Sequence, residues 1–217
     1  MDQIGKKPNS FKRAEGLYLL HIPLLRYHIA ACLLFLVSSV FAQSPSDFNY
    51  YKTITIQPSQ IAGASALIDF PFLFSTTNAE FATVGNGGRL QSSNGYDILF
   101  TNADGSAKLN HELEFYHASG QIVAWVKTDL DPSSTTILRI YFGSATALTD
   151  SSTPSTWSSA YQAVWHFDDN TDASATGAHL TNSGSTNSTN AIIGTSQNFD
   201  EGTYYQTGVE SNLNING

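Results

Sequence analysis

Two glutamates, Glu112 and Glu114, alternate in a segment with the period-two pattern of a β-strand. On a strand both carboxylates would share one face and lie about 6.6 Å apart. A glycoside hydrolase needs two carboxyl groups about 5 to 9 Å apart across its substrate, so this spacing permits that chemistry. Exposed strand faces are also commonly acidic, and we expect neither Glu112 nor Glu114 to be catalytic.

The pair His111-Glu112 resembles the start of the zinc-protease motif His-Glu-x-x-His, but Phe115 occupies its fifth position. On a strand, positions i and i+4 also do not converge on a metal as they do on a helix. The sequence holds no Gly-x-Ser-x-Gly elbow, and its single cysteine is Cys32. These observations argue against zinc, serine and thiol chemistry, and we expect a protein that is not an enzyme.

Asp168, Asn170 and Asp172 alternate in a polar segment and resemble the first half of a calcium loop, which supplies several oxygens from a short stretch of chain. The EF-hand pattern itself fails, because Ala173 stands at the glycine position and His179 at the bidentate glutamate position. Asp168 and Asp172 are therefore the candidate calcium ligands, with a solvated acidic turn as the alternative. Calcium is the only cofactor that the sequence raises.

Four aromatic residues are candidates for stacking on sugar rings, because aromatic faces complement the C–H faces of pyranoses. Trp125 and Trp165 lie beside valines in apolar strand patterns, and we expect them to fill cores. Tyr204 and Tyr205 follow an Asp-Glu-Gly turn and are expected to be more exposed. Tyr204 and Tyr205 are therefore the candidate ligand-binding residues.

The segments that must position these residues are short and are separated by turn residues, with no apolar repeat of helical period over three turns. Pro71 cannot donate to a ladder, which predicts an edge strand or a bulge at that point. About six strands in roughly 100 residues are typical of an antiparallel β-sandwich. The expected strands are 51–57, 66–74, 95–101, 108–116, 121–127 and 134–143.

Two turns connect these strands. The turn Asn102-Ala103-Asp104-Gly105 combines Asx side chains with a glycine, so we expect 108–116 to return as the hairpin partner of 95–101. The loop Ala118-Ser119-Gly120 places a glycine at the left-handed position, and we expect the two strands that flank it to pair.

A change of composition follows residue 146. Residues 147–160 are rich in Ser and Thr and predict a linker or an ordered connecting loop between a β-sandwich domain, 47–146, and a second unit, 161–217. The second unit opens with an expected strand at 160–167. It is too short to enclose its own sandwich core, so we expect it to be the N-terminal part of a truncated domain.

The N-terminal region predicts export. Residues 29–42 form an apolar run that follows five basic residues and precedes polar sequence, and a spanning helix would need about 20 apolar residues. Val40 and Ala42 are small residues at the −3 and −1 positions, which predicts cleavage between Ala42 and Gln43. A lipidated Cys32 is the alternative, but the apolar run continues beyond it. We expect a 1–42 signal peptide and a secreted or cell-surface protein without a membrane span.

Removal of residues 1–42 leaves five basic and 16 acidic residues, a net charge of −11. Such a surface repels phosphate backbones, so we expect no nucleic-acid partner. Extracellular glycans and surface proteins are the partners that remain.

Residues 49–146 resemble the bacterial domain of unknown function 2341. The resemblance implies a secreted or surface protein with several domains, and it implies no activity. The residues that carry it are Gly95, Asp97, Ile98, Phe100, Asp104, Gly105, Glu112, Glu114, Trp125, Val126, Tyr141, Phe142 and Gly143.

The segments 163–169 and 196–208 resemble the opening of a concanavalin-like jelly roll of the laminin-G type. That resemblance implies an all-β fold, with a β-sandwich followed by an incomplete jelly roll, and binding of glycans or proteins. We therefore expect an exported, non-catalytic carbohydrate-binding or adhesion module of a larger protein. The alternative is an accessory module of a secreted carbohydrate-active enzyme whose catalytic part lies beyond residue 217.

Overall fold

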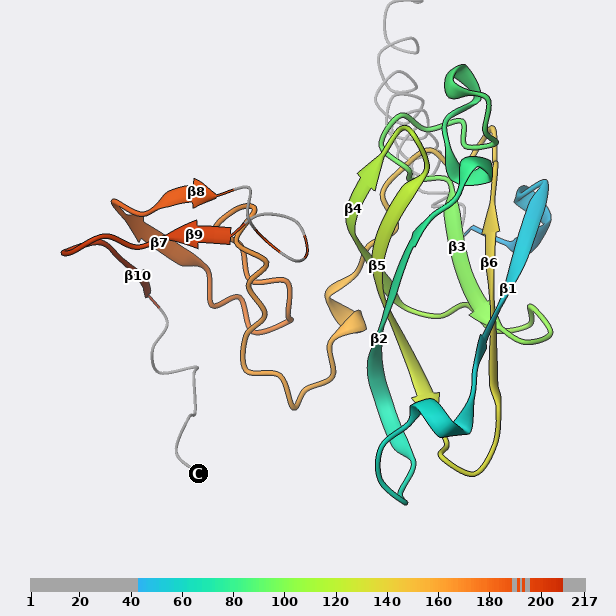
Figure 1. The fold of residues 1–217 in the computed structure, drawn as a ribbon, viewed down its shortest axis with the longest axis horizontal. Helices are drawn as coiled ribbons and strands as arrows, with labels where there is room; N and C mark the ends of the chain where they lie inside the picture. The colour runs from blue at the N-terminus through green and yellow to red at the C-terminus, as the bar shows by residue number, and fades with distance from the viewer. Residues whose placement is uncertain (1–42, 189–190, 192, 194–195, 209–217) are drawn as a thin grey trace, which may run out of the picture. The chain divides into compact units, whose positions relative to one another are not determined.

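Alternating β-branched and aromatic residues form two antiparallel three-stranded sheets. The computed structural model describes residues 43–188, 191, 193 and 196–208. The sheets face each other in Figure 1, with β4, β5 and β2 in one layer and β3, β6 and β1 in the other. The first sheet comprises β2 (Leu67–Thr77), β5 (Gln121–Leu130) and β4 (His111–His117), and the second β1 (Tyr50–Ile56), β6 (Thr136–Phe142) and β3 (Ile98–Asn102). The predicted all-β, antiparallel sandwich is confirmed.

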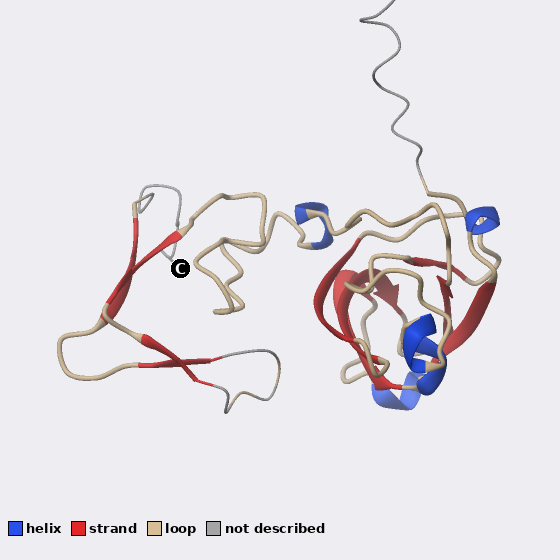
Figure 2. Ribbon diagram, turned by 90° about the horizontal axis from the view of Figure 1, so that it is seen from above, coloured by secondary structure: helices blue, strands red, loops and turns tan. Residues whose placement is uncertain are grey.

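The core lies between these two layers, and Figure 2 shows the strands of both sheets surrounding it. Phenylalanines from both layers and from a connecting turn meet edge to face, with ring centroids 5.6 Å apart for Phe74 and Phe100 and 4.8 Å apart for Phe81 and Phe142. Edge-to-face pairs of this kind contribute beyond their buried area. The fully buried apolar side chains include Phe81, Leu90, Ile98, Phe100, Ile122, Val126, Ile140 and Phe142.

Strand β2 confirms the prediction made from Pro71. It is an edge strand of its sheet, and its register against β5 shifts between Leu67 and Phe70. Asp69 lies in that irregularity with φ of 54°, and its N–H donates to the Asp129 carboxylate at 2.8 Å. The edge position lets proline stand in the strand without removing a ladder bond.

The expected hairpin between the strands around residues 95–101 and 108–116 is wrong. β3 pairs with β6, whereas β4 pairs with β5, so the chain crosses from one sheet to the other between them. Only one isolated bridge, Thr101 to Lys108, remains of the expected pairing. Turn residues mark a reversal of chain direction, but they do not determine which sheet the next strand joins, and β4 joins the sheet of β5 with Leu113 packed against the core.

The second expected hairpin is confirmed. β4 and β5 pair directly, and Gly120 in their connecting turn has φ of 102°. A Cβ at this position would lie 2.2 Å from the Asn78 carbonyl oxygen, so the turn excludes any side chain here.

Helical structure in the described residues consists of single 3₁₀ turns. None of them is long or apolar enough to cross a membrane. The turns are η1 (Pro45–Asp47), η2 (Pro58–Gln60), η3 (Ala79–Phe81), η4 (Val84–Asn86) and η5 (Pro154–Thr156).

Residues 147–160, the expected linker or connecting loop, run along the free edge of β4. The Leu113 N–H donates to Ser152 Oγ at 3.0 Å, and the Thr153 N–H donates to the His111 carbonyl at 3.1 Å. The turn η5 then brings Trp157, 7% exposed, onto the same sheet. This segment therefore satisfies backbone groups that an edge strand would otherwise leave open. The domain boundary placed here stays a prediction.

Four short strands follow in two antiparallel pairs. β7 (Leu180–Ser183) pairs with β10 (Tyr204–Thr207), and β8 (Thr186–Ser188) pairs with β9 (Ser196–Asn198). The strand expected at 160–167 is wrong, because this segment has no ladder partner among the described residues. It is linked to the next turn by two 2.8 Å hydrogen bonds, from the Ala173 N–H to the Val164 carbonyl and from the Val164 N–H to the Asp172 carboxylate. The predicted signal peptide, including Ala42, lies outside the described residues.

Candidate functional site

An aromatic groove of about 480 Å³ lies beside β7 and β10. Its described lining contains no charged side chain. Phe199 and Tyr204 are 54% and 51% exposed, and such solvent-facing aromatic clusters are typical of binding surfaces. The groove is lined by Trp165, Phe167, Leu180, Phe199, Thr203, Tyr204, Tyr205 and Thr207.

Tyr204 and Tyr205, the candidate ligand-binding residues, both line this groove. Successive side chains of a strand point to opposite faces, and Tyr205 is accordingly the more buried of the two. Its ring lies 5.7 Å from Phe167 and 5.8 Å from Phe199 between centroids. Tyr205 therefore packs the groove from within, while Tyr204 presents its ring to solvent.

Trp165 supplies another wall of the groove, and the expectation that it fills a core is wrong. Its indole is only partly buried, and its Nε1–H donates to the Ala178 carbonyl at 2.8 Å. That bond holds the ring plane against the turn before β7. Gln197 Nε2 donates to the Phe167 carbonyl at 2.9 Å and ties the next residue of this wall to β9.

Asp172, a candidate calcium ligand, organises the turn behind this wall. Its buried carboxylate accepts the N–H groups of Val164, Ser174 and Ala178 at 2.8 to 2.9 Å, and also the Ser174 hydroxyl at 2.9 Å. Burial alone would raise the pKa of Asp172, but these hydrogen bonds outweigh it and lower that pKa below its usual value. Four protein donors therefore already compensate the charge of this carboxylate.

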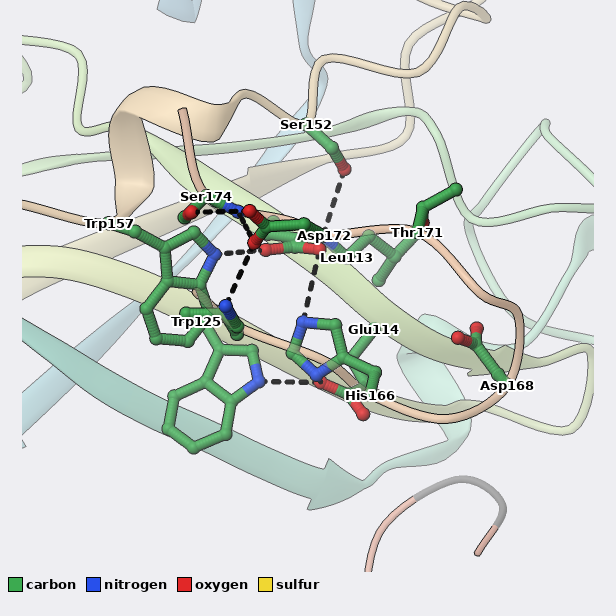
Figure 3. Close-up of polar contacts among 12 residues, drawn as sticks. Leu113, Glu114, Trp125, Ser152, Trp157, His166, Asp168, Thr171, Asp172 and Ser174 are labelled. Carbon is green, nitrogen blue, oxygen red and sulfur yellow. Dashed lines mark hydrogen bonds and ion pairs between the residues drawn. The ribbon is translucent and has the colours of Figure 1, made fainter. Parts of the chain in front are cut away.

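Asp168, the other candidate calcium ligand, is exposed and accepts the Asp169 N–H at 2.8 Å. Figure 3 shows its carboxylate well apart from that of Asp172. Among the described residues, no three His, Cys, Asp or Glu side chains are arranged to hold a metal ion. Calcium binding stays a prediction that depends on Asp168.

Glu112 and Glu114 share the outer face of β4, as the alternation predicts, and both meet His166. Nδ1 of His166 lies 2.7 Å from Glu114 Oε2, and Nε2 lies 3.2 Å from Glu112 Oε1. The second contact is close enough for an ion pair but is not directed as a hydrogen bond. All three side chains are largely buried, with 6 to 18% exposure.

Two tryptophans complete this cluster, which we call the carboxylate clamp: Glu112, Glu114, Trp125, Trp157 and His166. Trp125 Nε1–H donates to Glu114 Oε2 at 2.6 Å, and Trp157 Nε1–H donates to Glu112 Oε2 at 2.5 Å. Figure 3 shows Glu114, Trp125 and His166 turned toward one another. Trp125 thus lies on the outer face of β5, and the expectation that it fills the core is wrong.

The clamp holds His166 in its charged form. Burial lowers the pKa of the imidazole, but hydrogen bonding and the negative charges of Glu112 and Glu114 outweigh it and raise that pKa to about 10. At neutral pH the cluster therefore contains an imidazolium between two carboxylates.

His111, although adjacent to Glu112, belongs to a different environment. Its side chain is buried on the inner face, 5.2 Å from the Phe100 ring, and its Nε2 is 3.2 Å from Ser151 Oγ. Burial lowers the pKa of His111 to about 4, so this ring is neutral at pH 7. His111 and Glu112 face opposite sides of the sheet, which agrees with the rejection of a zinc-protease motif.

His166 and Trp157 are the functional candidates that sequence reasoning missed. The alternation of Glu112 and Glu114 indicated a shared face, but no local pattern indicates which distant residue covers it. A histidine flanked by two aromatic residues in 165–167 is the one signal that points toward this segment.

Comparison with family models matches residues 94–183 to a domain of unknown function (DUF2341). The match supports the resemblance found in the sequence and continues through η5, the clamp and Asp172. Comparison with curated proteins and with solved structures gives no match. The jelly-roll resemblance of residues 161–217 stays a prediction.

Proposed function

We propose that this chain is an exported, non-catalytic β-sandwich module that binds neutral extracellular glycans through the aromatic groove. The observation that carries the proposal is the groove itself, in which several aromatic side chains surround about 480 Å³ with two of them half-exposed. Pockets with an apolar lining and a few polar groups are typical ligand sites. Thr203 and Thr207 are the polar residues of the lining, and the Thr203 hydroxyl bonds to the backbone of Asp200.

The preference for a neutral ligand follows from charge. The described groove lining is uncharged, and the chain after residue 42 carries a net charge of −11. An anionic sugar would find no cationic partner in the groove and would be repelled by the surrounding surface. A neutral hexose chain avoids both costs.

The absence of catalysis is supported by the state of the two carboxylates. Each of them accepts a tryptophan N–H and contacts the same imidazolium, so neither is free to protonate a glycosidic oxygen or to attack an anomeric carbon. Glu112 and Glu114 therefore serve structure in this proposal.

Export is supported by the charge order and the small residues of the N-terminal 42 residues. N-terminal sequencing of protein secreted by a bacterial host tests it directly. The proposal expects the mature chain to begin at Gln43, and retention of residues 1–42 on secreted protein would contradict it.

Glycan-array binding by the secreted chain tests the proposed function. We expect binding to neutral oligosaccharides and a loss of about two- to ten-fold in affinity for Tyr204→Ala, taking stacking on an aromatic ring as worth on the order of 0.5 to 1.5 kcal/mol, as in aromatic pairs. Tyr51→Ala is the matched control, since Tyr51 is 56% exposed but lies on β1.

An array on which the wild-type chain binds nothing would contradict glycan binding. Release of reducing ends from a bound sugar by the natural full-length protein would instead favour the alternative, an accessory module of a carbohydrate-active enzyme.

A further inference from the structure

The carboxylate clamp and the aromatic groove share one short stretch of chain, residues 165–167. His166 enters the clamp, whereas Trp165 and Phe167 line the groove. His166 thus points to one side of the chain and its two neighbours to the groove, so a single stretch serves both. The position of the groove wall is therefore linked to the position of one imidazole.

We propose that Glu112 and Glu114 are positioning residues of the glycan groove, which hold the wall formed by Trp165 and Phe167 through their ion pairs with His166. The inference rests on the proposed glycan function of that groove. It assigns the outer face of β4 to the regulation of binding, although neither glutamate lines the groove.

The clamp adds to a small set of contacts that hold the wall, which include the bond from Gln197 to the Phe167 carbonyl and the two bonds of the Val164 backbone. Residues 160–167 have no ladder partner among the described residues, and Phe167 has φ of 64°, a conformation that non-glycine residues rarely adopt. A strained residue persists only where its surroundings hold it. The bond from Gln197 to the Phe167 carbonyl is one such constraint, and the clamp adds another one residue earlier in the chain.

The clamp also explains why the sandwich presents two carboxylates on a half-buried face. Removing one partner of a buried ion pair leaves the other charge uncompensated, which lowers the free energy of unfolding. The groups that face His166 are Glu112 and Glu114 from β4 and the ring of Trp157, at 5.9 Å between centroids. Because the pKa of His166 is raised to about 10, the imidazolium is retained throughout the neutral range.

The sign of the pH dependence follows from the raised pKa of His166. Its stabilising contribution is fully present below about pH 6.5, the ordinary histidine value, and is lost as the pH rises through about 10. Replacing one glutamate lowers the pKa of His166 and moves this loss toward neutral pH.

The test uses Glu114→Gln in the secreted chain, with Glu80→Gln as the matched control. Glu80 is an exposed glutamate of the same sandwich that pairs with Lys52 rather than His166. Affinity for an oligosaccharide selected on the array is measured from pH 6 to 9, and NMR of the histidine rings reports the pKa of His166.

We expect the pKa of His166 to fall by about two units in Glu114→Gln, because one of its two charge partners is removed. Affinity of this variant should remain near wild type at pH 6 and fall about ten-fold by pH 9, whereas wild type and Glu80→Gln stay constant. Amide hydrogen exchange at residues 164–167 should accelerate over the same pH range.

A lowered His166 pKa with an unchanged affinity profile would overturn the inference and leave the proposed function intact. If the wild-type chain binds no glycan, the proposed function fails, and hydrogen exchange alone tests whether the clamp positions the wall. Unchanged exchange at residues 164–167 in Glu114→Gln would overturn that role, and faster exchange at high pH would support it. Should Glu114→Gln not fold, Glu112→Gln removes the less directed contact and is read in the same way.

Discussion

Nδ1 of His166 lies 2.7 Å from Oε2 of Glu114, and the same oxygen accepts the Nε1–H of Trp125. This pair joins the segment after the sandwich to the outer face of the sandwich itself. Two donors on one carboxylate oxygen leave it fully compensated, which suits a structural anchor. The predictions below test the parts of the molecule that produce this arrangement.

Trp157→Phe should lower the free energy of unfolding by about 2 kcal/mol, because a hydrogen bond to a charged acceptor contributes roughly 1.5 to 3 kcal/mol. The lost bond is the 2.5 Å contact from Trp157 Nε1 to Glu112. Urea denaturation measures the loss. Combining the change with Glu112→Gln should give a coupling of about 1 kcal/mol, and strictly additive effects would contradict the contact.

Acidification should destabilise the protein through His111. Because burial holds its pKa at about 4, the unfolded state binds a proton that the folded state refuses between about pH 6.5 and 4. The contribution is present above pH 6.5 and is lost as the pH falls, by up to about 3 kcal/mol. His111→Leu should flatten this part of the stability profile, whereas His117→Leu, at the exposed end of β4, should leave it steep.

Gly95→Ala should destabilise the sandwich by about 2 to 4 kcal/mol, which combines left-handed strain with a steric clash. Gly95 has φ of 73°, and an added Cβ would lie 2.5 Å from the Tyr116 ring, whose hydroxyl donates to the Phe81 carbonyl. Gly87→Ala is the control, with φ of 83° and open space around the Cβ. Thermal melting should separate the two variants, and equal losses would show that the clash is relieved.

Asp172→Ala should destabilise the chain by about 2 to 4 kcal/mol, because it leaves buried N–H donors unpaired. Because the pKa of Asp172 is lowered in the folded protein, the stabilising contribution of its carboxylate is present above about pH 3.8 and is lost as the pH falls further. We expect the loss to be equal in calcium and in a chelator. A thermal shift with calcium that disappears in Asp168→Ala would instead establish the predicted calcium site.

Local sequence patterns were sufficient to predict several elements of the fold. Pro71 indicated the edge strand, and Gly120 indicated the turn between β4 and β5, because both depend on the conformational limits of single residues. The shared face of Glu112 and Glu114 likewise followed from the period of a strand. Tyr204 is half-exposed, as its position after the Asp-Glu-Gly turn indicated.

The pairing of strands far apart in the sequence could not be predicted from such local patterns. The chain from β3 to β4 turns as its residues predict, yet it crosses to the opposite sheet, because burial of distant apolar residues selects the partner. The valine beside Trp125 indicated a core position, but the Trp125 side chain lies on the outer face of β5 and donates to Glu114. The segment 160–167 has strand-like composition, but it joins no ladder among the described residues, and His166 is held by side-chain contacts with β4.

The sequence by itself determined the all-β class, the net charge of −11 after residue 42 and the candidate residues, since these follow from composition and from period-two alternation. Only the tertiary structure decided that His166 lies between Glu112 and Glu114 and that Trp165 and Phe167 form the groove wall. The reason is physical: a pKa of about 10 and a shared cluster arise from through-space electrostatics and burial, which depend on residues far apart in the chain.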